Sequence, residues 1–124
     1  MSDELIPPEV REFIIDHIAS IAQLEALLLL AQKNAPTTAA SVAAHLYIAE
    51  NQAKEILTGL CKAGLADCTD DVYWFNNEPA GQRETVDRLT ALYSTHLIPV
   101  TNLVHSKPAG VRAFASAFKL RKDR

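Results

Sequence analysis

The stretch that decides the fold is SVAAHLYIAENQAKEILTGLCKAGLADC, residues 41–68. Its apolar residues have the i, i+3 and i+4 spacing of two short helices, and residues 47–49 separate these helices as a tight turn. Gly64 stands where the second helix, residues 50–63, needs a left-handed backbone in order to end. The next residues, 65–68, have strand propensity. We therefore expect two helices, joined by a turn, that lead directly into a strand.

The flanking sequence predicts further helices and a β-hairpin. On the N-terminal side we expect a helix from Pro8 and a second one capped by Ser20, and then Thr37 or Thr38 as the cap of the helix that contains Val42. On the C-terminal side, a turn at residues 69–71 and the aromatic run 72–75 complete a hairpin, with Tyr73 and Phe75 on one face and Trp74 on the other. A long helix begins near Gln82, and Pro99 is expected to kink or interrupt it. A last amphipathic segment spans residues 111–118.

This order of elements resembles the winged helix-turn-helix domain of bacterial MarR-like and ArsR-like transcriptional regulators. The resemblance covers residues 37–76, and it rests on matching positions in one run: Val42-Ala43, Leu46, residues 47–49, Ala53, Ile56-Leu57, Leu60 and Gly64-Leu65. It implies a mostly α fold with a three-helix core, a β-hairpin wing and additional C-terminal helices. The corresponding division is an N-terminal arm (1–8), a winged helix-turn-helix domain (9–78) and C-terminal helices with a basic tail (79–124).

The resemblance implies a DNA-binding transcriptional regulator that acts as a homodimer. On the helix over residues 50–63, a regulator would direct polar side chains toward the bases and a lysine toward phosphate. Asn and Gln suit adenine edges, and Lys supplies charge for the backbone. The candidate DNA-binding residues are therefore Asn51, Gln52, Lys54 and Thr58 toward bases, and Lys62 toward phosphate.

Several residues depart from what DNA binding requires. The helix over residues 50–63 is net neutral, because Glu50 and Glu55 offset its two lysines. The hairpin carries Asp67, Asp70 and Asp71 where a wing normally carries a cation. These aspartates are also ordinary turn residues. The whole chain has a net charge of −3, so no general basic field attracts nucleic acid.

Two residues of the helix-turn-helix stretch are unusual for the resembling family or for a helix. The turn has the bulky Tyr47 where the resembling regulators often have glycine. Gly59 stands in the middle of a helix, where it costs about 1 kcal/mol relative to Ala. We expect close approach of another backbone or side chain at Gly59.

The second hypothesis is therefore a protein-interaction module that keeps the winged-helix scaffold without binding DNA. It would use the acidic hairpin, the aromatic strand or the basic C-terminal segment. The last of these surrounds two phenylalanines with cations, and it would dock on its own domain opposite the acidic first helix, or bind a copy or another protein. Its apolar face is short for stable binding to a membrane. The candidate partner-binding residues are Arg112, Phe114, Phe118, Lys119, Arg121 and Lys122.

An apolar stripe from Val86 to Val104 leaves two alternatives open. It is either part of the chain's own core or, as in the resembling regulators, a helix that packs on the two-fold mate of a dimer.

Nothing in the sequence points to catalysis or to a bound cofactor. The four histidines are scattered over different elements without the spacing of a metal site, and no P-loop, GxSxG or GxGxxG occurs. Cys61 is expected in the core and Cys68 on a strand, and no second cysteine pair completes a zinc site. The densest apolar run, residues 24–31, is too short to span a bilayer, and no signal peptide is recognisable. We expect a cytoplasmic protein without enzymatic activity, metal or cofactor, and without a membrane partner.

Overall fold

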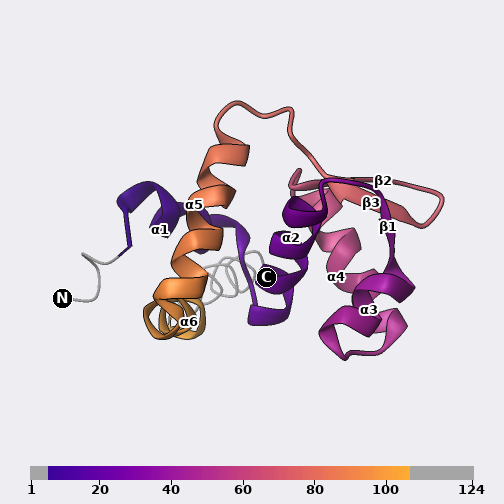
Figure 1. Ribbon diagram of the computed structural model, residues 1–124, viewed down its shortest axis with the longest axis horizontal. Helices are drawn as coiled ribbons and strands as arrows, with labels where there is room; N and C mark the ends of the chain where they lie inside the picture. Colours follow the sequence, from indigo (N-terminus) through magenta and orange to yellow (C-terminus); the bar gives the residue numbers. More distant parts are fainter. Residues whose placement is uncertain (1–5, 107–124) are drawn as a thin grey trace, which may run out of the picture.

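The computed structural model describes residues 6–106, and this part of the chain is mostly helical, as expected, with one small antiparallel sheet (Figure 1). The elements in chain order are α1 (Pro8–His17), α2 (Ile21–Lys33), β1 (Thr37–Thr38), α3 (Ala39–Leu46), α4 (Glu50–Lys62), β2 (Ala66–Thr69), β3 (Val72–Phe75), α5 (Gln82–Thr95) and α6 (Leu97–Ser106).

Local side-chain chemistry sets where the first helices begin and end. Pro8 is the first residue of α1, where its missing N–H costs nothing. The Ser20 hydroxyl accepts a hydrogen bond from the Gln23 backbone N–H at 3.1 Å and caps α2, while the Thr38 hydroxyl accepts from Ser41 at 3.1 Å and caps α3. The expected caps are confirmed, with Thr38 rather than Thr37 in the second case.

Helices α3 and α4 end in the same kind of turn. The Leu65 N–H donates to the Leu60 carbonyl at 2.9 Å and the Gly64 N–H to Cys61 at 3.1 Å, with Gly64 at φ +81°. This is a Schellman motif, and it confirms the role expected of the glycine. At the end of α3 the Ile48 N–H donates to Ala43 at 3.0 Å, and here the left-handed position, φ 59°, is taken by Tyr47.

The sheet has the order β1-β3-β2. The expected hairpin is confirmed: β2 and β3 pair antiparallel, and Asp70 and Asp71 at its tip have positive φ values of 49° and 67°, as a type I′ turn requires. Strand β1 pairs with β3 on the other side, with Thr37 opposite Tyr73. The sequence does not predict β1, because a strand of two residues has no periodicity of its own and exists only through its partner.

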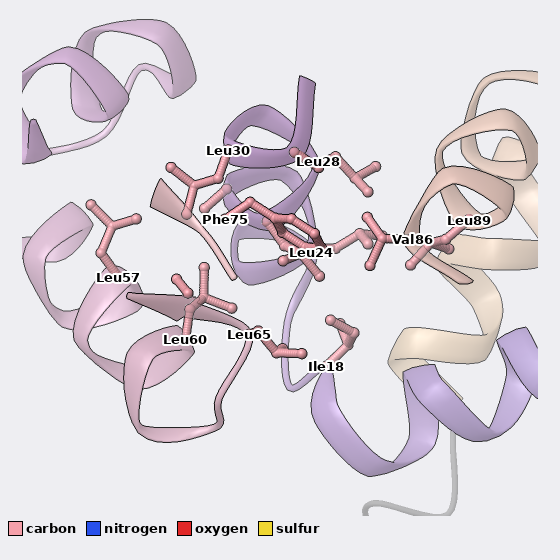
Figure 2. Close-up of a cluster of buried hydrophobic side chains, with 14 of the residues drawn as sticks. Ile18, Leu24, Leu28, Leu30, Leu57, Leu60, Leu65, Phe75, Val86 and Leu89 are labelled. Carbon is pink, nitrogen blue, oxygen red and sulfur yellow. The ribbon is translucent and has the colours of Figure 1, made fainter. Parts of the chain in front are cut away.

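Helix α2 lies in the middle of the core, between α4 and the sheet on one side and α5 on the other (Figures 1 and 2). A helix in such a position is apolar around most of its circumference. Its buried residues accordingly exceed one stripe: Leu24, Ala26, Leu27, Leu28, Leu30 and Ala31. The same core takes in Ile6, which lies within the expected N-terminal arm, and reaches as far as Val104 in α6.

The side-chain amide of Gln82 links the end of the hairpin to the end of α4 and the start of α5 by hydrogen bonds. Gln82, the first residue of α5, donates from Nε2 to the Asn76 carbonyl at 2.8 Å and to the Gly64 carbonyl at 3.2 Å. Asn76 also donates from its side chain to the Gly64 carbonyl at 3.0 Å. The end of α4, the end of β3 and the start of α5 therefore hold one another in place.

The long C-terminal helix is interrupted at His96, and Pro99 falls in the first turn of α6, where the absent N–H removes no helical hydrogen bond. Val86, Leu89, Val100 and Val104 are buried within the chain. For these four residues the stripe is part of the chain's own core. Leu97 and Ile98, at the corner between α5 and α6, remain 49% and 65% exposed.

Within residues 6–106, no single helix has both the length and the apolar character needed to cross a membrane. Only α1 and α2 taken together reach that length and composition, and they are bent by 114° relative to each other.

Candidate functional site

The outer face of α4 presents all five candidate DNA-binding residues to solvent. The inner face of the helix is closed by Ala53, Leu57 and Leu60, which are buried. The residues that alternate with them at helical spacing are exposed, and four of them with Gly59 line a shallow hollow of about 350 Å³. The exposed candidates are Asn51, Gln52, Lys54, Thr58 and Lys62; the hollow is lined by Lys54, Glu55, Thr58, Gly59 and Lys62.

The expectation of a close approach at Gly59 is wrong for residues 6–106. A Cβ built at this position meets only the Gln23 side-chain nitrogen, at 4.0 Å, which is an ordinary contact distance. The described part of the chain therefore has no packing reason for a glycine here. The missing side chain does leave the floor of the α4 hollow open toward solvent.

The charge on this face is balanced. Lys54 and Lys62 are exposed, and so are Glu50 and Glu55. No side chain caps the start of α4, and Glu50 in the first turn places a negative charge beside the free N–H groups, which stabilises the helix but disfavours a phosphate there.

The hairpin adds an acidic edge next to α4. Asp67, Asp70 and Asp71 are all exposed. The predicted alternation on β3 is confirmed, because Tyr73 and Phe75 are buried in the core, whereas Trp74 is half-buried on the opposite face. Trp74 lines a smaller hollow of about 220 Å³ with the chain that links α2 to β1.

A further hollow, of about 410 Å³, lies between α2, the α3–α4 turn and α5. Its apolar wall is formed by Leu28, Leu29 and Leu46, and Tyr47 stands at the same hollow with 94% of its surface exposed. The remaining lining residues are polar: Glu25, Gln32, His45, Thr90, Tyr93 and Ser94. Sequence reasoning missed this site, although Tyr47 at a turn position that favours glycine was a usable signal.

One hydrogen bond organises the polar side of this hollow. The Tyr93 hydroxyl, on α5, donates to Glu25 Oε2, on α2, at 2.8 Å. Burial, and next the hydrogen bond to the Glu25 carboxylate, raise the pKa of Tyr93 to about 12. The phenol therefore stays protonated at neutral pH and keeps the carboxylate in place.

The two cysteines are free thiols. Cys68 lies on β2, as expected, and is exposed, whereas Cys61 is half-buried at the edge of the core rather than inside it. Burial, together with a hydrogen bond to Cys68, raises the pKa of Cys61 to about 12. Among residues 6–106, no three His, Cys, Asp or Glu side chains are grouped as metal ligands.

The candidate partner-binding residues Arg112, Phe114, Phe118, Lys119, Arg121 and Lys122 lie outside the described residues.

Comparison with known proteins does not place the chain in a family. No protein-family model matches it, and no curated protein matches it.

Proposed function

We propose that the chain is a winged helix-turn-helix protein that binds double-stranded DNA through the outer face of α4. The observation that carries the proposal is that α4 is buried on one face and fully open on the other, with polar residues suited to base edges along the open face. Strand β1, directly before α3, pairs with the hairpin, so that helix-turn-helix and hairpin form one unit. Such a unit can present one helix to a major groove.

In this proposal the polar residues of the first turns of α4 meet the bases. Asn51 and Gln52 can each donate and accept at an adenine edge, and Lys62, the last residue of α4, can reach a phosphate. Gly59 supports an external partner, because it costs the helix about 1 kcal/mol relative to Ala and has no packing reason within the described residues. Without a Cβ, the α4 backbone can approach a sugar or phosphate closely.

Electrostatics limit the affinity that this face alone provides. Each phosphate neutralised contributes a slope of about −0.9 to a plot of log affinity against log salt. Lys62, the candidate directed toward phosphate, therefore accounts for a slope of about −0.9. The six basic residues among positions 107–124 would steepen it if they also contact the duplex.

The test is binding of the full chain to a short random-sequence duplex as a function of salt. We expect binding at low salt that Lys54→Ala together with Lys62→Ala weakens strongly. Lys33→Ala, which removes an exposed lysine from the last turn of α2, is the matched control and should leave binding unchanged. Absence of binding at low salt, or an equal loss in the control, contradicts the proposal.

A second candidate function, a protein-interaction module, is favoured by the acidic hairpin. Asp67, Asp70 and Asp71 are exposed on one short hairpin and repel a duplex, whereas they suit a basic partner.

One double variant separates the two candidates. Asp70→Asn with Asp71→Gly removes two charges and keeps residues that favour the type I′ turn. Higher affinity of this variant for the duplex supports DNA binding, because a repulsion has been removed. Unchanged duplex binding combined with loss of binding to a lysine-rich peptide supports the interaction module instead.

A further inference from the structure

We propose that the hollow between α2, the α3–α4 turn and α5 binds a small amphipathic organic cation, with its ammonium group at Glu25 and its apolar body on Leu28, Leu29 and Leu46. This inference does not rest on the DNA-binding proposal, because it uses a different surface of the molecule. The two hollows share no lining residue.

The size and the walls of the hollow fit a small molecule rather than a macromolecule. Its volume of about 410 Å³ lies within the range of small-molecule sites, which is about 300–1,000 Å³. Leu28 is buried and Leu46 is half-buried, so the apolar wall belongs to the rigid core rather than to a mobile loop. A flat ring or a short alkyl chain can pack against this wall.

The charge of the lining selects a cation. Glu25 is half-buried, and neither the ion pair between Arg83 and Asp87 nor the one between Arg88 and Glu9 involves it. Among residues 6–106, no lysine or arginine lines the hollow. Tyr93 holds one carboxylate oxygen by its hydrogen bond and leaves the negative charge of Glu25 without a cationic partner among residues 6–106. A bound ammonium would supply that partner.

Tyr47 is a second, independent observation that points to a ligand. It holds the left-handed backbone position that ends α3, at φ 59° and ψ 45°, where an L side chain is strained and glycine is not. Its ring gains no burial in return, because 94% of the side chain is exposed. An aromatic face at the rim of a hollow with one carboxylate attracts an organic cation.

The test uses benzylammonium as the probe, with benzyl alcohol and benzoate as controls of the same shape. Binding to the full chain is followed by amide chemical shifts. We expect saturable shifts from benzylammonium at residues that line the hollow, and affinity weaker by roughly tenfold or more for both controls. Equal binding of benzyl alcohol or benzoate, shifts confined to another surface, or no saturable shifts would overturn the proposal.

Two variants test the roles of the named residues. Glu25→Gln keeps an acceptor for Tyr93 and removes the charge, and it should lower benzylammonium affinity roughly tenfold. Tyr47→Gly should raise the melting temperature while lowering the affinity, which a purely structural role of Tyr47 would not produce. If Glu25→Gln does not fold, the comparison of the three probes on the unchanged chain still decides.

The chain's own basic segment is the competing occupant. Lys119→Gln, Arg121→Gln and Lys122→Gln, made together in the full chain, should leave benzylammonium binding unchanged. A large gain in affinity would show that this segment fills the hollow, and it would overturn the proposal of a small-molecule ligand.

Discussion

Replacing Gly59 by alanine should stabilise the protein, although the position lies at the candidate DNA-binding face. In the middle of a helix, alanine is favoured over glycine by about 1 kcal/mol, because glycine loses more backbone entropy on folding. The new Cβ meets only the Gln23 side-chain nitrogen at 4.0 Å, so no steric cost offsets the gain. For a chain of this size, about 1 kcal/mol corresponds to a rise of about 4 °C in the melting temperature.

The same substitution five residues later should have the opposite effect. Gly64 has φ +81° and nothing lies within 4 Å of its added Cβ, so Gly64→Ala introduces strain without any clash. A left-handed backbone costs an L residue about 1–2 kcal/mol. The two variants add an identical methyl group, one within α4 and one in the turn that follows it, and neither meets a steric clash, so backbone conformation distinguishes them.

The assay is thermal and urea unfolding of the full chain and both variants, followed by far-ultraviolet circular dichroism. Shifts of opposite sign are expected. A loss of stability in Gly59→Ala, or shifts of the same sign in both variants, would refute the reasoning from backbone conformation. Duplex binding measured on the same samples adds a functional readout: Gly59→Ala should bind DNA more weakly while being more stable, because its Cβ occupies the floor of the α4 hollow.

Three further predictions concern the core, a helix cap and the hollow beside α5. Leu60→Ala should destabilise the chain by about 2–5 kcal/mol in urea unfolding, since the Leu60 side chain is fully buried and its removal leaves a cavity in the core; a loss below about 1 kcal/mol would contradict this. Thr38→Ala should cost about 1 kcal/mol by removing the cap of α3, and Thr38→Ser should restore most of it; equal losses in both would show that the hydroxyl does not cap. Because the pKa of Tyr93 is raised to about 12 in the folded state, its contribution to stability is complete below about pH 10 and is lost as pH rises toward 12. Near-ultraviolet absorbance should show a tyrosine that titrates near pH 12 and that Tyr93→Phe removes; a signal near pH 12 that Tyr93→Phe leaves unchanged would contradict the prediction.

The features of this chain that could be predicted are those whose cause lies within a few residues. Ser20, Thr38 and Gly64 act on backbone groups no more than four residues away, and Asp70 and Asp71 form the hairpin turn by themselves. The exposed face of α4 could be predicted for the same reason, because helical periodicity determines the outer residues once the inner ones are known.

The features that could not be predicted depend on neighbours distant in the chain. Strand β1 exists because β3 offers it unpaired hydrogen-bonding groups, and packing decides that, among residues 6–106, a Cβ at Gly59 would meet only the Gln23 side chain. The stripe from Val86 to Val104 could not be assigned to the core or to a dimer until the position of α1 and α2 beside α5 and α6 was known.

The sequence by itself determined the helices up to α4, the caps of α2 and α3, the hairpin and the polar face of α4, whereas the break at His96 between α5 and α6 was not predicted. Only the tertiary structure decided that Glu25, Tyr47 and Tyr93, from three separate elements, meet at one hollow. The physical reason is the distance along the chain over which each effect acts. Capping and periodicity act over one or two helical turns, whereas a binding site is formed by the surfaces that burial of the core brings together.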